Sequence, residues 1–244
     1  EVSFSFDGQR IGRLSDDQRD SRSAFIHEDK LRFKIFPDVH NQAIGIRDLP
    51  FAVSETDDRY VQGIYWTALS DEAGGCAFFN RGAMGAVRES DGGFSLPLAY
   101  AMYYIWGTRM LNGRFTYRFS LYPFSGRWAT ADLHRRALEY SHPCVGLCTP
   151  PGDGRLGNES QILQPSSRNV ILSALYPRNG SLYARFYEYR GEKGALELST
   201  NQHQAKIDEV NLIGKEIRPL SLPAQFEPWQ IRTFRICGVP GVSG

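Results

Sequence analysis

The sequence predicts an all-β protein built as a sandwich or barrel, and three observations support this fold class. Several short segments alternate polar and apolar residues with the two-residue period of a half-buried strand. Glycine-containing turn signals separate these segments. Only one stretch has the spacing of a helix. Many short strands with turns between them are typical of sandwiches and barrels.

The predicted strands differ in how many faces they bury. Residues 30–35 and 114–121 alternate strictly, so each is expected to cover a core with one face. Residues 181–189 are rich in the aromatic side chains that pleated surfaces favour. Residues 170–175 form a continuous apolar run, which predicts a strand that is covered on both faces.

The turns and the helix are predicted from local signals. Asn112-Gly113 and Asn179-Gly180 suit type I′ hairpins, in which both central residues need positive φ. The predicted helix covers residues 131–140, begins at Asp132 as its N-cap and ends before Pro143.

A linker and a domain boundary are predicted in the second half of the chain. Residues 149–157 contain prolines and glycines that no regular element would tolerate. We expect a larger β-sandwich, which an N-terminal truncation could have shortened, over residues 1–164. A smaller β-sandwich and a tail are expected over residues 165–244. The first residue is Glu1 rather than methionine, which indicates a processed or excised chain.

Composition and charge exclude several kinds of partner. The net charge is +1, from 28 basic and 27 acidic side chains, so we expect no nucleic acid and no anionic membrane as a partner. No apolar run approaches the roughly 20 residues of a transmembrane helix, and no signal peptide is visible. The sequence predicts a soluble protein and leaves its compartment unknown.

No metal site is predicted. Cys144 and Cys148 lie four residues apart, but no second ligand pair follows, and Cys76 and Cys237 stand alone. His27-Glu28-Asp29 has the His-x-Asp spacing that puts two ligands on one face of a strand, yet no further ligand cluster accompanies it. We therefore expect the cysteines to be thiols without a metal or a disulfide partner, and His27-Glu28-Asp29 to be ordinary surface residues.

No catalytic constellation is visible either. A retaining glycosidase needs two carboxyl groups about 5–5.5 Å apart, and no stretch of the sequence indicates such a pair. Nucleophile elbows, phosphate-binding glycine loops and dinucleotide fingerprints are absent from the sequence.

A series of segments, in order along the chain, is similar to segments of one known family. These are residues 29–37 (DKLRFKIFP), 75–82 (GCAFFNRG), 117–128 (YRFSLYPFSGRW), 170–177 (VILSALYP), 185–191 (RFYEYRG) and 228–235 (PWQIRTFR). They resemble the C-terminal β-sandwich region of glycoside hydrolase family 38, the α-mannosidase family. Ser141, Tyr176 and Gln230 depart from the family's pattern, which has Asn, Lys and Glu there, and this indicates a divergent branch.

The resemblance implies both a fold and a function. The fold would be a galactose-mutarotase-like supersandwich followed by a smaller β-sandwich, with one short helix. The function would be hydrolysis of α-mannosidic bonds in mannose or oligosaccharide metabolism. The family's catalytic Asp and zinc belong to a preceding domain, so we expect no catalytic residue, cofactor or metal in this chain, and no activity of the chain alone. The implied partners are that catalytic domain and mannosides, and a homo-oligomer is left open.

Five residues are candidates for the rim of the substrate cleft, because the family's C-terminal region packs against the catalytic domain. They are Arg185, Glu188, Asn80, Arg81 and Trp128. Each residue also has a purely structural explanation. Arg185 and Glu188 could be ions of the surface or of an interface, Asn80 and Arg81 could form a hairpin turn, and Trp128 could pack in the core.

Two other functions remain open. A lectin-like carbohydrate-binding module would use Trp66, Trp106 and Trp128 as stacking surfaces, although the packing of a large sandwich core is the better explanation of these aromatic residues. A self-contained mutarotase-like enzyme would need His and Glu side chains that converge on a cleft. Finally, residues 100–106 are apolar on both alternating faces, which fits either a strand that is covered on both sides within its own domain or a surface that docks on the catalytic domain.

Overall fold

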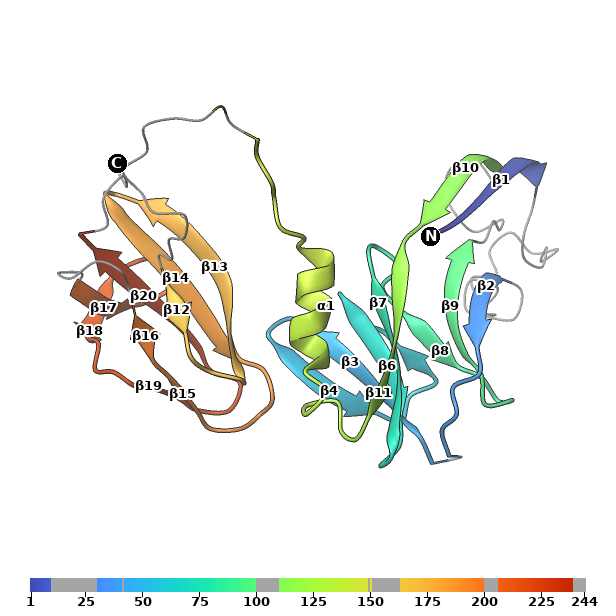
Figure 1. The fold of residues 1–244 in the computed structure, drawn as a ribbon, viewed down its shortest axis with the longest axis horizontal. Helices are drawn as coiled ribbons and strands as arrows, with labels where there is room; N and C mark the ends of the chain where they lie inside the picture. The colour runs from blue at the N-terminus through green and yellow to red at the C-terminus, as the bar shows by residue number, and fades with distance from the viewer. Residues whose placement is uncertain are drawn as a thin grey trace, which may run out of the picture. The chain divides into compact units, whose positions relative to one another are not determined.

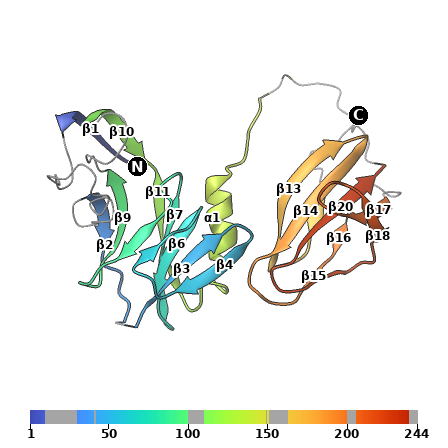
Figure 2. The same cartoon turned by 180° about the vertical axis from the view of Figure 1, so that it is seen from behind.

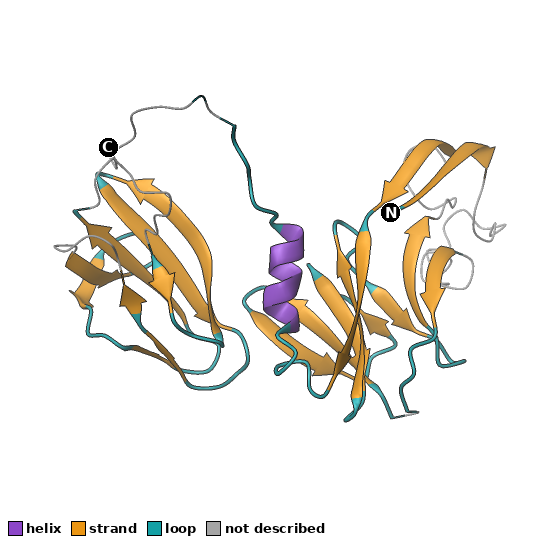
Figure 3. Cartoon of the chain, in the orientation of Figure 1, coloured by secondary structure: helices purple, strands orange, loops and turns teal. Residues whose placement is uncertain are grey.

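The structure is a computed structural model that describes residues 1–9, 30–40, 42–99, 110–148, 150, 163–199 and 206–238. The chain divides into two units, Glu1–Pro143 and Cys144–Gly244. Each unit consists of antiparallel strands in several sheets, so the predicted all-β sandwich class is confirmed (Figures 1 and 3). The predicted linker lies almost entirely outside the described residues, and the domain boundary at residue 164 stays a prediction.

The first unit contains three sheets and a helix. The five-stranded sheet has the order β11-β7-β6-β3-β4, the four-stranded sheet β2-β9-β8-β5, and β1 pairs with β10. The elements are β1 (Val2–Gln9), β2 (Leu31–Ile35), β3 (Ile44–Leu49), β4 (Ala52–Thr56), β5 (Tyr60–Val61), β6 (Trp66–Ser70), β7 (Gly74–Asn80), β8 (Ala86–Arg88), β9 (Phe94–Ala99), β10 (Leu111–Tyr117), β11 (Phe119–Ser125) and α1 (Leu133–Ser141).

The five-stranded sheet is covered on both faces. Phe78 of β7 is fully buried and packs against Phe94 of β9, with ring centroids 5.2 Å apart. Its neighbour Phe79 points to the opposite face, where its ring lies 6.3 Å from that of Tyr140 in α1. Successive side chains of a strand alternate between faces, so one face packs on the four-stranded sheet and the other on the helix. This explains why β6 is buried at every position.

The predicted helix forms as α1 and is tied to this sheet by a buried hydrogen bond. Nε1 of Trp66 donates to Nδ1 of His134 over 3.1 Å. Burial, with a smaller contribution from the charge of Arg135, lowers the pKa of His134 to about 4, which keeps the ring neutral and able to accept. Asp132 is the N-cap residue as predicted, but its φ is 54° and its side chain makes no capping hydrogen bond.

A second buried polar group, Asp48 of β3, holds the start of β6. Its carboxylate is 1% exposed and accepts hydrogen bonds from the backbone N–H groups of Tyr65, at 3.0 Å, and Trp66, at 2.9 Å. Burial raises the pKa of Asp48 to about 6, because the loss of water penalises the charged form more than these bonds favour it.

The second unit is organised around one five-stranded sheet of order β13-β14-β20-β17-β18 (Figure 2). Two short pairs, β12-β16 and β15-β19, complete it, and a core that includes Leu182, Phe186, Leu196, Phe226 and Phe234 fills its interior. The strands are β12 (Gln164–Pro165), β13 (Val170–Arg178), β14 (Ser181–Glu188), β15 (Gly194–Leu196), β16 (Leu198–Ser199), β17 (Lys206–Val210), β18 (Glu216–Pro219), β19 (Ala224–Phe226) and β20 (Ile231–Cys237).

One predicted strand is in fact two. The alternating run over residues 114–121 is broken at Arg118, where β10 ends and β11 begins. The first half pairs with β1 and the second with β7, in different sheets. The two-residue period continues through a change of sheet, so the pattern alone could not reveal the break.

The two predicted type I′ hairpins have opposite outcomes. Asn179 and Gly180 have φ values of 49° and 69° and connect β13 to β14, as predicted. Asn112 and Gly113 lie within β10, opposite Asp7 and Phe6 of β1, so the hairpin predicted there is wrong.

The apolar run that was predicted to be covered on both faces lies at a sheet edge. β13 is the first strand of its sheet and pairs only with β14. Val170 and Ile171 are buried, but exposed and half-buried residues alternate after them, and Leu175 is 42% exposed. The prediction is wrong beyond Ile171, because an apolar composition does not distinguish a central strand from an edge strand.

We predict that Asp48 makes the first unit less stable as the pH rises. The folded pKa of about 6 lies above the ordinary 3.8, so folding favours the protonated form, and this stabilisation is lost as the pH rises from 3.8 through 6. Relative to Asp48→Asn, the wild type should lose up to about 3 kcal/mol of unfolding free energy over this range. Urea denaturation of both proteins between pH 4 and pH 7 measures the difference; a difference that does not change with pH would contradict it.

Candidate functional site

The five candidate rim residues are divided between the two units. Asn80, Arg81 and Trp128 belong to the first unit, and Arg185 and Glu188 to the second. The structure gives the contacts of each residue within its own unit, and their role at a cleft rim stays a prediction.

Glu188 is the most highly coordinated side chain of the five. It ends β14, is fully buried, and its Oε1 accepts hydrogen bonds from the backbone N–H of Arg190 at 2.7 Å and from Nδ2 of Asn169 at 3.2 Å. Its Oε2 accepts from the N–H groups of Gly191 at 2.9 Å, Trp229 at 3.0 Å and Glu192 at 3.2 Å. A buried carboxylate requires such a set of donors, and here they come from three separate segments of the chain.

The local backbone explains how these donors converge. Gly191 has a φ of 75°, which turns the chain after β14 back toward the Glu188 side chain. Successive N–H groups then point at one carboxylate, an anion-binding arrangement known as a nest. Trp229, with a φ of 56°, adds its N–H from the turn before β20. The Glu188 network, meaning Glu188 with these five donors, therefore joins three segments of the second unit.

Arg185 does not take part in this network. It lies opposite Thr233 of β20, and its Nε donates to the Thr233 hydroxyl over 3.2 Å. Arg185 is half-buried, whereas Glu188 is fully buried three residues later. The structure therefore places these two predicted residues in different surroundings.

A buried ion pair in the same unit could not be predicted from the sequence. Nε and Nη2 of Arg232 donate to the two carboxylate oxygens of Glu209 over 2.8 and 2.6 Å, and Arg218 donates to the same carboxylate over 2.8 Å. The Arg232 hydrogen bonds lower the pKa of Glu209. The guanidinium of Arg232 also lies over the rings of Phe226 and Phe234. This pair is structural, and the three residues are too far apart in sequence to form a motif.

Asn80 and Arg81 lie at the end of β7, next to the helix. The buried Asn80 accepts a hydrogen bond from the N–H of Gly82. Arg81 donates from Nε and Nη2 to the Tyr140 carbonyl at the C-terminal end of α1, and its guanidinium stacks 4.7 Å from the Tyr140 ring. A cation at this end of a helix is favourable, because it complements the helix dipole and satisfies a terminal carbonyl.

Arg81 also lines a basic pocket. This open pocket of about 590 Å³ is formed by Arg81, Arg114, Arg118, Thr116 and Glu1. The pocket contains three guanidinium groups. One of them, that of Arg118, already pairs with a carboxylate, because its Nε donates to Glu1 over 2.7 Å. The chemistry of this pocket suits a negatively charged or hydroxyl-rich group.

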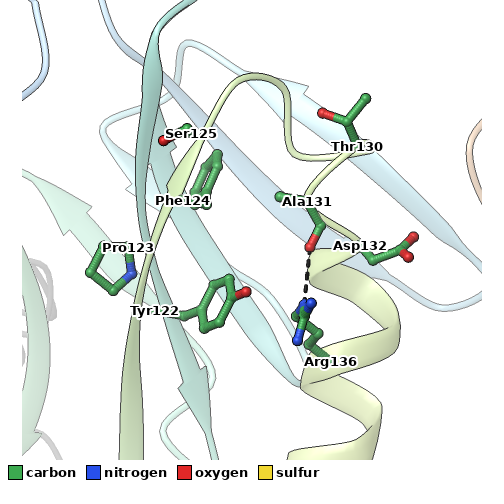
Figure 4. A pocket seen from close by; sticks show the side chains of 8 residues that line it. All are labelled: Tyr122, Pro123, Phe124, Ser125, Thr130, Ala131, Asp132 and Arg136. Atoms are coloured by element: carbon green, nitrogen blue, oxygen red, sulfur yellow. Dashed lines mark hydrogen bonds between the residues drawn. The ribbon is translucent and has the colours of Figure 1, made fainter.

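A second pocket lies between β11 and the beginning of α1 (Figure 4). It has a volume of about 460 Å³ and is lined by Tyr122, Pro123, Phe124, Ser125, Thr130, Ala131, Asp132 and Arg136. Nε of Arg136 donates to the Ala131 carbonyl over 3.3 Å, and its guanidinium lies over the Tyr122 ring. The other neighbour of that ring is Phe79, stacked at 5.3 Å, so Tyr122 is engaged by the protein's own groups.

Two of the three tryptophans that supported the lectin-like alternative are buried. Trp66 is fully buried in β6, and Trp128 is only 8% exposed and donates from Nε1 to Glu55 over 3.0 Å. Neither can stack on a sugar in this conformation. Trp106 lies outside the described residues, as do His27-Glu28-Asp29 and the apolar segment of residues 100–106.

The remaining chemical groups show no catalytic arrangement among the described residues. His40 pairs with Asp71, and Nδ1 of His142 bonds to the Leu138 carbonyl. No group of three His, Cys, Asp or Glu side chains in the described part could hold a metal ion. All four cysteines are free. No described helix combines the length and the apolar character needed to cross a membrane.

We predict that Glu188→Ala destabilises the second unit by about 3 kcal/mol, because four part-buried backbone N–H groups lose their acceptor together and each lost hydrogen bond costs about 0.5–1.5 kcal/mol. Glu192→Ala is the matched control: it removes an exposed carboxylate of the same turn but keeps the backbone N–H, and should change stability by less than about 0.5 kcal/mol. Urea denaturation followed by circular dichroism measures both. Equal losses in the two variants would contradict this role of Glu188.

Comparisons with known proteins agree with this description. Residues 169–234 match the model of the glycosyl hydrolases family 38 C-terminal beta sandwich domain. The matched segment begins at Asn169 and contains the whole Glu188 network. A comparison with curated proteins finds no match.

Two solved structures share the fold of most of the chain. One is described as an alpha-mannosidase from Enterococcus faecalis V583 and the other as a protein in the glycosyl hydrolase family 38 from Enterococcus faecalis. Each has a TM-score of 0.72 and 16% sequence identity over 84% of this chain. The chain spans only about a quarter of their length, 25% and 26% respectively.

The resemblance inferred from the sequence is thus confirmed over residues 169–234 by the family model. Over 84% of the chain, the solved structures show that the fold is shared. The segment that carries the Glu188 network is therefore similar to the C-terminal beta sandwich domain of glycosyl hydrolases family 38.

Proposed function

We propose that this chain is the C-terminal region of an α-mannosidase-like glycoside hydrolase, which hydrolyses α-mannosidic bonds. The family-38 match over residues 169–234 carries this proposal. The similar fold of a solved alpha-mannosidase, of which this chain spans 25%, supports it further. In this proposal the remaining part of the protein supplies the nucleophilic Asp and the zinc.

The chemistry of the described residues fits a supporting role. The buried carboxylates of Asp48, Glu188 and Glu209 are engaged by donors of their own units, so none is positioned to attack a sugar or to protonate a leaving group. A glycosidase site would need two accessible carboxyl groups across a cleft. The proposed role of this chain is to pack against the catalytic domain and to complete its substrate cleft.

We predict that the isolated chain does not hydrolyse an aryl α-mannoside, with or without added zinc, whereas the full-length protein does. The full-length protein without this chain is the second comparison, because it separates the catalytic groups from their support. We expect it to have reduced activity or reduced stability. Turnover by the isolated chain would contradict the proposal, and so would an inactive full-length protein that is folded and loaded with zinc.

Arg81 is the rim candidate that we propose to test first, because it lines the basic pocket. In the full-length enzyme, Arg81→Ala should lower kcat/KM about tenfold if the guanidinium contacts the sugar. Arg127→Ala, which removes another exposed guanidinium of the same unit, is the control and should leave kcat/KM unchanged. A variant that melts earlier but keeps its kcat/KM would show that Arg81 only caps α1.

A further inference from the structure

Trp229 is an exposed tryptophan at the turn between β19 and β20. It is 57% exposed, whereas Trp66 is fully buried and Trp128 nearly so. Exposure of a large aromatic ring is unfavourable in water, and such residues on rigid surfaces mark binding sites more often than smaller apolar residues do.

The backbone of Trp229 is held in a conformation that bulky residues avoid. Its φ of 56° lies in the left-handed region, where a branched or aromatic side chain is an outlier. Three hydrogen bonds fix this turn: Trp229 N–H to Glu188, Gln230 N–H to the Glu227 carbonyl over 3.0 Å, and Glu227 N–H to the Gln230 side chain over 3.0 Å. Strain of this kind persists only where the surroundings enforce it, and it concentrates at functional sites.

The indole ring is positioned as firmly as the backbone. Its six-membered ring lies against Gly191, where an added Cβ would stand 2.4 Å from Cζ2, so only glycine allows this contact. Gly191 and Trp229 both donate to Glu188, which therefore fixes the ring and its support together.

The two turns that meet at the ring carry charged side chains. Lys193, two residues after Gly191, pairs with Glu227, two residues before Trp229, over 3.8 Å, and their side chains are 80% and 65% exposed. A protein interface of standard size needs about 800 Å² per partner and excludes charges from its centre. A flat ring next to charged donors and acceptors fits a smaller ligand that has one apolar face and a polar edge.

We propose that Trp229 is a stacking platform for a pyranose ring, with Lys193 and Glu227 available to the hydroxyl groups of the sugar. A pyranose presents C–H groups on one face and hydroxyls at its edge, and this matches the two kinds of surface. The platform is pre-organised by Glu188 and Gly191, which lowers the ordering cost of binding. This site goes beyond the proposed function and does not depend on it.

The test uses the indole N–H signals in the ¹H–¹⁵N spectrum of the 244-residue chain, titrated with D-mannose and α-linked mannobiose. The Trp229 signal, assigned by its loss in Trp229→Tyr, should shift and saturate with a Kd of about 1 to 10 mM, in the range of weak single-ring contacts. Trp66 and Trp128, whose Nε1 atoms are bound to His134 and Glu55, are internal controls that should not move. Sorbitol, an open-chain polyol, should give no saturable shift.

Three variants distinguish the contribution of the indole ring to sugar binding from an effect of the substitution on folding. Trp229→Gly, which also removes the backbone strain, should weaken binding at least about tenfold. Trp229→Tyr should retain part of the affinity. Ile213→Ala, at another turn of the same unit where Ile213 is 73% exposed, is the matched control and should bind normally.

Three outcomes would overturn the proposal. These are the absence of a saturable shift at Trp229, equal shifts with sorbitol, and unchanged affinity in a folded Trp229→Gly variant. Protection of the Trp229 indole from solvent in the full-length protein would also overturn it, because another part of the protein would then cover the ring. None of these results depends on α-mannosidase activity, which is assayed separately.

Discussion

The buried carboxylate of Glu188 is the constraint on which the second unit depends. A charge without water must be matched by donors, and Glu188 obtains them from the turn after β14, from Asn169 before β13 and from Trp229 before β20. These segments have to meet at one point, which determines the positive φ values of Gly191 and Trp229. The exposed tryptophan thus follows from a polar interaction in the interior. Glu188 thus shapes the surface of the second unit, and its role at a cleft rim stays a prediction.

In the first unit, too, a buried carboxyl group binds backbone N–H groups, although fewer of them. Asp48 accepts hydrogen bonds from the backbone N–H groups of Tyr65 and Trp66 and so fixes where β6 begins. The indole of Trp66 in turn donates a hydrogen bond to His134, which holds α1 on the sheet. In both units a carboxylate that could be mistaken for a catalytic group organises backbone. This agrees with the supporting role that we propose for the chain.

The sequence predicts those parts of the fold that depend on neighbouring residues. Asn179-Gly180 specifies its hairpin because positive φ at two adjacent positions is a local requirement. The break at Arg118 and the edge position of β13 depend on which strands pair, and neither alternation nor apolar composition contains that information. The role of Glu188 was beyond prediction for the same reason. Its donor Trp229 is 41 residues away, and only the nearby Gly191, three residues after Glu188, was a visible signal.

Backbone hydrogen exchange tests the organising role of Glu188 most directly. If the carboxylate binds these donors in solution, the amides of Arg190, Gly191 and Trp229 should exchange as slowly as those of β14 and β20, although they lie in turns. Exchange of these three amides at the rate of unprotected turn amides would contradict the account.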